Sequence, residues 1–240
     1  MSLNPARIAG VCYLLVIAGG LFAEVFVRGS LIVPGDAAET ASRIAADESL
    51  WRWGLAAHLL YLIPALVVNV LVPGLLAAPG SMPARLASTF GVVSVTVEGV
   101  ALLGLYVPLA LLDERAATPD LDRAPLTYLA VRLFSAGFGF ALVFFAAFCV
   151  LVGALILRYR RVPRPIGALM VAAGAGYLVN SLALVLADRA TLNERLVPWI
   201  LLPCLVGELS LTAWLLVKGT RAGVPAAATA IREPASSRRT

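Results

Sequence analysis

The chain has 240 residues, of which 60% are hydrophobic and 14% charged, and its net charge is +5. Soluble domains carry about 25% charged residues, so this composition excludes a soluble globular protein and indicates a membrane protein. The positive charge does not indicate a nucleic-acid-binding protein, because the basic residues fall between apolar runs and form no clustered base-reading face.

Six apolar runs are each long enough to cross the ~30 Å hydrocarbon core of a bilayer as a helix. The first is too long for the apolar core of a signal peptide, about 7 to 15 residues, so we expect it to remain as a span. The fold class predicted is therefore all-α, a polytopic transmembrane bundle of six helices within residues 1–218. The predicted spans are 8–27, 54–76, 86–112, 126–157, 166–186 and 196–217.

The segment after the first span predicts a short helix on the membrane surface. Asp36 and Glu39 have the spacing of a helix cap followed by a capping box, and this helix should end near Glu48. Trp51 and Trp53 follow and are expected to mark the outer membrane boundary.

Polar side chains recur at helical spacing inside the second and third spans. His58, Tyr61 and Asn69 share one stripe of the second span, and Ser94 and Glu98 share one stripe of the third. We expect both stripes to face the interior of the bundle, away from lipid.

The fourth and fifth spans each carry one polar residue of interest. Arg132 lies 26 residues before Arg158, or about 39 Å along a helix, which predicts a position at the outer headgroup boundary. The ladder Ala168, Ala172, Gly176 and Asn180 has four-residue spacing and predicts a close approach by a neighbouring helix.

The last span carries Glu208 near its middle, with no basic residue between Arg195 and Lys218. A charge at that depth costs about 2.5 to 3.5 kcal/mol on insertion scales, which the leucines of the run can offset. The residues after it, 219–240, are rich in Ala, Pro, Ser and Arg and predict a disordered cytoplasmic tail.

The charges between the spans predict the orientation of the chain. With the N-terminus inside, the inner segments hold 11 Lys and Arg with one acid, and the outer segments hold 7 with 10 acids. The short loop with Arg158, Arg160, Arg161 and Arg164 is typical of the cytoplasmic side, so both termini are expected there. This loop could also bind anionic lipid headgroups.

Several runs of the sequence resemble one family. They are ARIAGVCYLLVIAGGLFAE (6–24), GDAAETASRI (35–44), AGFGFALVFF (136–145), YLVNSLAL (177–184) and GELSLTAWLLVKG (207–219). They resemble the bacterial membrane proteins called domain of unknown function 4386. The resemblance implies a six-helix, multi-pass protein of the bacterial inner (plasma) membrane with no assigned activity. Many members have a His where this chain has Phe148, so a role that depends on that histidine is not implied here.

Six polar residues in or beside the spans are the candidates for a ligand-binding site, because intramembrane ionisable residues mark functional sites by default. The competing interpretation is that these side chains only satisfy one another or reach the interface. If they form a site, Glu98 and Glu208 would meet at its centre and the other four would line the outer half of the bundle. The candidates are Glu24, His58, Glu98, Arg132, Asn180 and Glu208.

Three classes of function stay open at this point. A carrier or receptor for a small cation or amphiphile would use the two central glutamates, and a scaffold or regulatory subunit would use the surface helix, arginine loop or tail. An enzyme is less expected, because the chain has one histidine and no HExxH, nucleophile or phosphate-loop motif.

Cys12, Cys149 and Cys204 lie in apolar runs and form no disulfide framework. We expect no cofactor and no metal. The predicted partners are the lipid bilayer and a small-molecule or ion ligand, with no nucleic acid, and the sequence does not identify a protein partner.

The two halves of the sequence show matching offsets. Glu98 is 13 residues after Arg85, as Glu208 is after Arg195, and the similar runs VVNVL and LVNSL hold Asn69 and Asn180. An inverted repeat would leave this pattern and would place a site at the midplane between the halves. Chance similarity between apolar helices is the alternative.

Overall fold

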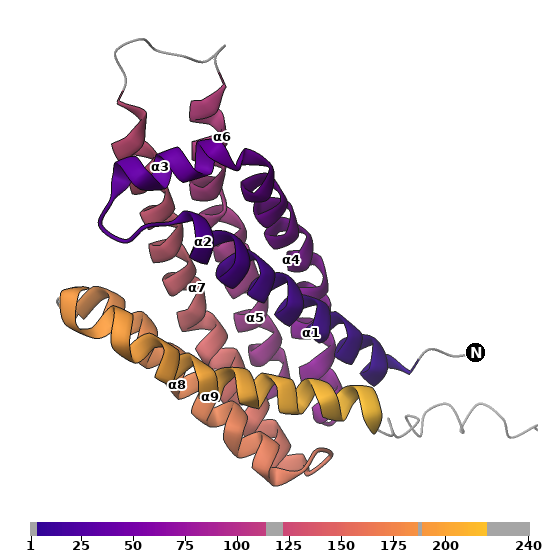
Figure 1. Cartoon of the computed structure of the whole chain (residues 1–240). Helices are drawn as coiled ribbons and strands as arrows, with labels where there is room; N and C mark the ends of the chain where they lie inside the picture. The colour runs from indigo at the N-terminus through magenta and orange to yellow at the C-terminus, as the bar shows by residue number, and fades with distance from the viewer. Residues whose placement is uncertain (1–3, 114–121, 187–188, 220–240) are drawn as a thin grey trace, which may run out of the picture.

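The structure is a computed structural model that describes residues 4–113, 122–186 and 189–219, apart from the side chains of 189–201. All secondary structure within these ranges is helical (Figure 1). The helices in chain order are α1 (Pro5–Leu21), η1 (Phe22–Arg28), α2 (Gly29–Leu31), α3 (Ala37–Ala46), α4 (Glu48–Leu76), α5 (Met82–Ala101), α6 (Leu103–Leu112), α7 (Arg123–Tyr159), α8 (Arg164–Leu186) and α9 (Arg189–Val217).

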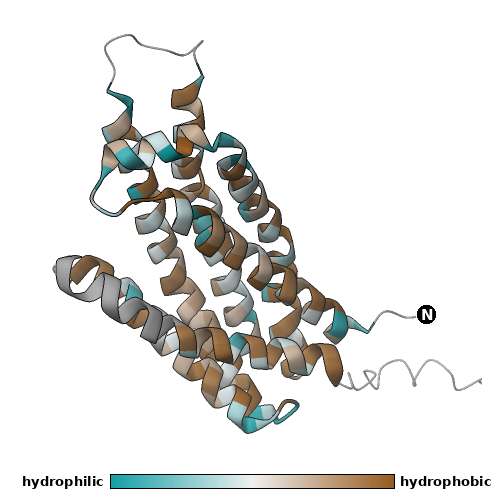
Figure 2. Ribbon diagram, viewed as in Figure 1, coloured by the Kyte–Doolittle hydropathy of each residue, from teal (hydrophilic) through white to brown (hydrophobic). Residues whose placement is uncertain are grey.

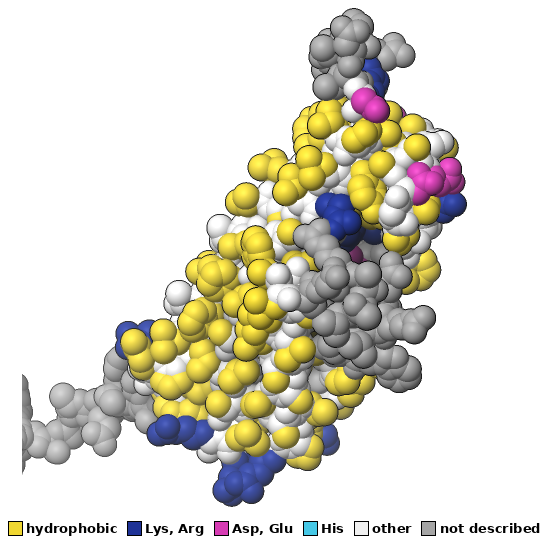
Figure 3. Space-filling view, turned by 90° about the vertical axis from the view of Figure 1, so that its left-hand side faces the viewer, with side chains coloured by type: hydrophobic (Ala, Val, Ile, Leu, Met, Phe, Trp, Pro, Cys, Tyr) yellow, Lys and Arg dark blue, Asp and Glu magenta, His cyan; other side chains and the backbone are white. Residues whose placement is uncertain are grey.

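Five helical stretches of the described chain are long and apolar enough to cross a membrane. Hydrophobic residues run along the helices of the bundle (Figure 2), and hydrophobic side chains cover most of the face seen in Figure 3, with basic side chains at its lower end. Along α9 the described apolar part, Leu202–Val217, is shorter than a full span, so the sixth span stays a prediction. The five stretches are Pro5–Leu31, Glu48–Leu76, Met82–Leu112, Arg123–Tyr159 and Arg164–Leu186.

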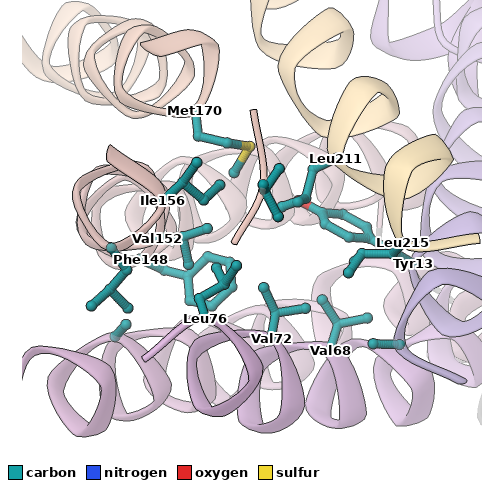
Figure 4. Packing of buried hydrophobic residues seen from close by; sticks show 14 of the residues in the cluster. Tyr13, Val68, Val72, Leu76, Phe148, Val152, Ile156, Met170, Leu211 and Leu215 are labelled. Atoms are coloured by element: carbon teal, nitrogen blue, oxygen red, sulfur yellow. The ribbon is translucent and has the colours of Figure 1, made fainter. Parts of the chain in front are cut away.

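The long helices pack in a closed ring. Each contacts the next in the order α1, α4, α5, α7, α8 and α9, and α9 returns to α1. Side chains from α1, α4, α7, α8 and α9 point toward one another in the main apolar core (Figure 4). Asn4 and Gly219 lie side by side, so the two described ends of the chain meet at one end of the bundle.

The short helix α3 confirms the prediction made from Asp36. The Asp36 carboxylate accepts a hydrogen bond from the Glu39 amide at 2.9 Å, which caps the helix. The Glu39 side chain does not complete a capping box, because it accepts a hydrogen bond from Arg43 Nε at 2.8 Å. Figure 1 shows α3 lying across the upper end of the bundle.

The second and third spans differ from their predicted bounds. Asp47 caps α4, which therefore starts at Glu48 and carries Trp51 into the core. Trp51 is 2% exposed and its indole N–H donates to the Leu105 carbonyl at 3.0 Å, so it packs in the core and does not face lipid as a membrane anchor would. Trp53, on the outward face, is 67% exposed. The third span breaks at Leu102 into α5 and α6.

The small-residue ladder on α8 does not make the predicted contact. Ala168 and Ala172 are exposed. The close approach between α7 and α8 uses Gly153, Gly167 and Gly174 instead: Gly153 and Gly167 face each other, and Gly174 lies against the α7 backbone at Ala146 and Val150. Small residues occupy both faces of α8, so their spacing alone did not identify the packed face.

Substituting Gly153 tests this close approach. An added Cβ would lie 2.6 Å from the Gly167 carbonyl oxygen, so Gly153→Ala should destabilise the protein by about 1–3 kcal/mol through overpacking. Thermal unfolding in detergent measures the effect. The control is Gly20→Ala, where no atom lies within 4 Å and alanine favours the helix, so the midpoint should stay or rise. Equal midpoints for the two variants would contradict the packing.

Candidate functional site

A buried cluster joins α4 to α5, and we call its members, His58, Tyr61 and Glu98, the histidine cluster. His58 Nε2 lies 3.0 Å from Glu98 Oε1, and the Tyr61 hydroxyl donates to the same oxygen and lies 2.6 Å from Nε2. His58 is fully buried and Glu98 is 8% exposed. The three-residue step from His58 to Tyr61 puts both on one face of α4, opposite the buried face of α5.

Aromatic rings of α7 close the histidine cluster on one side. The rings of Phe134 and Phe138 meet the His58 ring edge-on, with centroids 5.3 and 6.3 Å away. His58 Nδ1 is buried and has no hydrogen-bond partner among the described residues. A buried nitrogen without a partner costs free energy. The Nδ1 atom can therefore still donate or accept one hydrogen bond.

An ion pair on η1 lies beside this aromatic wall. Arg28 Nη1 donates to both carboxylate oxygens of Glu24, at 2.6 and 2.5 Å, and Nη2 donates to the Ser135 hydroxyl at 2.8 Å. The Arg28 guanidinium carbon also lies 4.6 Å from the centroid of the Phe134 ring. We call Glu24, Phe134 and Ser135 the cation niche, since together they hold a guanidinium group.

Two local features lie at the cation niche, a π-helical turn and a small cavity. The pair is formed on a π-helical turn, an arrangement often found at functional sites. A cavity of about 10 Å³, room for about one water molecule, adjoins Arg28 and Gly54, one turn before His58 on α4. Arg28 was missed by the sequence interpretation, which placed it at the start of the outer loop. Its four-residue spacing from Glu24, typical of a helical ion pair, was the available signal.

A second buried cluster surrounds Glu208, and we call Tyr13, Tyr177 and Glu208 the tyrosine cluster. The Tyr177 hydroxyl, on α8, donates to Glu208 Oε1. The Tyr13 hydroxyl, on α1, is directed at Glu208 but has no partner at hydrogen-bonding geometry among the described residues. Glu208 is 7% exposed, so it faces the protein interior and not lipid.

The structure therefore places the two central glutamates in separate clusters, not in one shared chamber. Glu98 bonds to α4 and Glu208 to α8. Of the other candidates, Glu24 joins the cation niche beside the histidine cluster, and Asn180 is half-buried on α8. Arg132 is exposed, with its guanidinium 5.9 Å from the Tyr128 ring centroid. Within the described ranges no three His, Cys, Asp or Glu side chains are grouped to hold a metal.

The apolar helices and the inward-facing polar clusters define a multi-pass integral membrane protein. A family model described as "Domain of unknown function (DUF4386)" matches residues 8–219. The chain belongs to this family, which confirms the resemblance found in the sequence. No curated protein and no solved structure matches the chain.

Removing the Tyr61 hydroxyl tests the histidine cluster. Tyr61→Phe should destabilise the protein by about 1–2 kcal/mol, because Glu98 loses a donor in a buried site. Unfolding in detergent measures this, and Tyr106→Phe is the control because Tyr106 is 56% exposed. In a double-mutant cycle with Glu98→Gln, a coupling energy near zero would show that the two side chains do not interact.

Proposed function

We propose that this protein is a carrier or receptor that binds a small organic cation or cationic amphiphile among η1, α4, α5 and α7. Glu98 would hold the charge of the ligand, and the cation niche would admit it. The observation that carries the proposal is that the niche already holds an organic cation, the guanidinium of Arg28.

The chemistry of the niche favours cations over other small ligands. A carboxylate supplies charge-assisted hydrogen bonds, and the face of an aromatic ring attracts a positive charge. Phe134 contacts both Arg28 and His58, so the niche and the histidine cluster share a wall. A cation that displaces Arg28 from Phe134 would lie near a second carboxylate, that of Glu98, which is buried where that of Glu24 is half-buried.

The distribution of basic residues supports the predicted orientation of the chain in the membrane. Arg158, Arg160, Arg161 and Arg164 lie at the end of the bundle where α7 leads into α8, and the lower end in Figure 3 shows basic side chains without acidic ones. By the positive-inside rule that end is cytoplasmic, and the histidine cluster then lies in the outer half. We propose the inner (plasma) membrane of a bacterium as the location, with the ligand entering from outside.

Neutralising Glu98 tests the assignment of the binding residue. Ethidium, a fluorescent organic cation, is the probe, titrated against protein in lipid nanodiscs. Glu98→Gln should weaken binding by about tenfold or more, equivalent to about 1.4 kcal/mol, because the charge that pairs with the ligand is lost. Glu39→Gln, an acid on the surface of α3, should bind as the wild type does. Absence of saturable binding by the wild type, or unchanged binding by Glu98→Gln, would refute the proposal.

Removing the guanidinium of Arg28 should strengthen the binding of ethidium. Arg28→Met leaves the Phe134 face and the Glu24 carboxylate free, so ethidium should bind about three- to tenfold more tightly when it no longer competes with the guanidinium. The matched control is Arg43→Met, which removes the same i,i+4 pair with Glu39 on α3 and should not change affinity. Weaker binding by Arg28→Met would mean that Arg28 belongs to the site and does not block it.

A further inference from the structure

Glu208 is a buried carboxylate that no described cation faces. The ionisable groups around it are Tyr13 from α1, Cys149 from α7, Tyr177 from α8 and Cys204 from α9, none of which carries a positive charge. The histidine cluster differs, because Glu98 contacts His58, and the ring of Phe134 contacts both His58 and the Arg28 guanidinium. A carboxylate charge without a cation is strongly disfavoured in a low-dielectric interior, and taking up a proton removes it.

The two tyrosines suit Glu208 in both of its charge states. A tyrosine hydroxyl is both a donor and an acceptor. When Glu208 is ionised, Tyr177 donates to it and the unpartnered Tyr13 hydroxyl can donate as well. When Glu208 is protonated, its O–H can donate to Tyr13 while Tyr177 keeps its bond. The spare hydrogen-bonding capacity of Tyr13 is what such an exchange requires.

The tyrosine cluster and the cation niche share one element. α1 carries Tyr13 and continues directly into η1, which carries Glu24 and Arg28. A shift of this continuous segment therefore reaches both Glu208 and the Phe134 wall. The π-helical turn of η1 lies on this segment, and such turns are frequently found at functional sites.

We propose that Glu208 is a separate site that takes a proton from water and returns it, and that proton binding there is coupled through α1 and η1 to cation binding at Glu98. The coupling rests on the function proposed above, whereas the proton site does not. The class of ligand at Glu208 is thus the proton, and the class at the histidine cluster is the organic cation.

Infrared spectroscopy of the protein in nanodiscs tests the proton site without ethidium. A protonated carboxylic acid gives its own carbonyl-stretch band. The band of Glu208 should weaken as the solution pH is raised and should be missing from the spectrum of Glu208→Gln. Glu98→Gln is the control and should keep that band. If Glu208→Gln fails to fold, Tyr13→Phe should shift the frequency of the band. Spectra that are the same for wild type, Glu208→Gln and Tyr13→Phe across the pH series would overturn the proposal.

Ethidium tests the coupling separately. Because linkage is reciprocal, ethidium at a concentration that just saturates the wild type should shift the pH midpoint of the Glu208 band in the wild type, and the shift should be smaller in Glu98→Gln, which binds ethidium more weakly. An unshifted midpoint in wild-type protein that binds ethidium would overturn the coupling alone. A titrating Glu208 band in protein that binds no ethidium would overturn the proposed function and leave the proton site.

Discussion

A carboxylate inside the apolar layer of a membrane protein must find its hydrogen bonds within the protein, because lipid chains offer none. In the described part of the chain two helices carry such a buried carboxylate, and in both the neighbouring helix supplies the donor. Tyr61 of α4 bonds to Glu98 of α5, and Tyr177 of α8 bonds to Glu208 of α9. These bonds hold the buried face of each glutamate helix against the helix that precedes it.

The histidine cluster and the tyrosine cluster have similar hydrogen bonds but different charged neighbours. In each half a central glutamate accepts a hydrogen bond from a tyrosine of the preceding long helix, and the helices follow one another around a ring in chain order. Both facts agree with an inverted repeat, which stays a prediction. Tyr61 lies eight residues before Asn69, whereas Tyr177 lies three before Asn180, so the tyrosines do not share the offset of the glutamates. The surroundings differ more, because among the described residues Glu98 has a histidine partner and the Phe134 wall with the Arg28 cation, whereas Glu208 has neither.

This difference suggests a division of roles between the halves. An organic cation needs both negative charge and an apolar face, which the region around Phe134 offers. A proton needs only a carboxylate that can be hydrogen-bonded in both charge states, which the tyrosines around Glu208 allow. The α1–η1 segment touches both regions and is the structural link between them.

Periodicity in the sequence was sufficient to predict the inward faces of the second and third spans. His58, Asn69, Ser94 and Glu98 are all buried, as their stripes indicated. The spacing of polar residues along a helix indicates which way their side chains face, because helix geometry is local. It does not indicate which residue of another helix lies opposite them. Arg28 was therefore missed, since its contacts with Phe134 and Ser135 join residues more than one hundred positions apart.

Composition, span length and charge between spans determined by themselves that this is a helical membrane protein with an inward polar face. Each of these depends on the free energy of single residues in lipid or water, which the residue type decides. Only the tertiary structure decided that the two glutamates have separate partners, that Trp51 enters the core and that the packed face of α8 is its glycine face. Those outcomes depend on the register between helices, which is settled by the fit of side chains from distant parts of the chain.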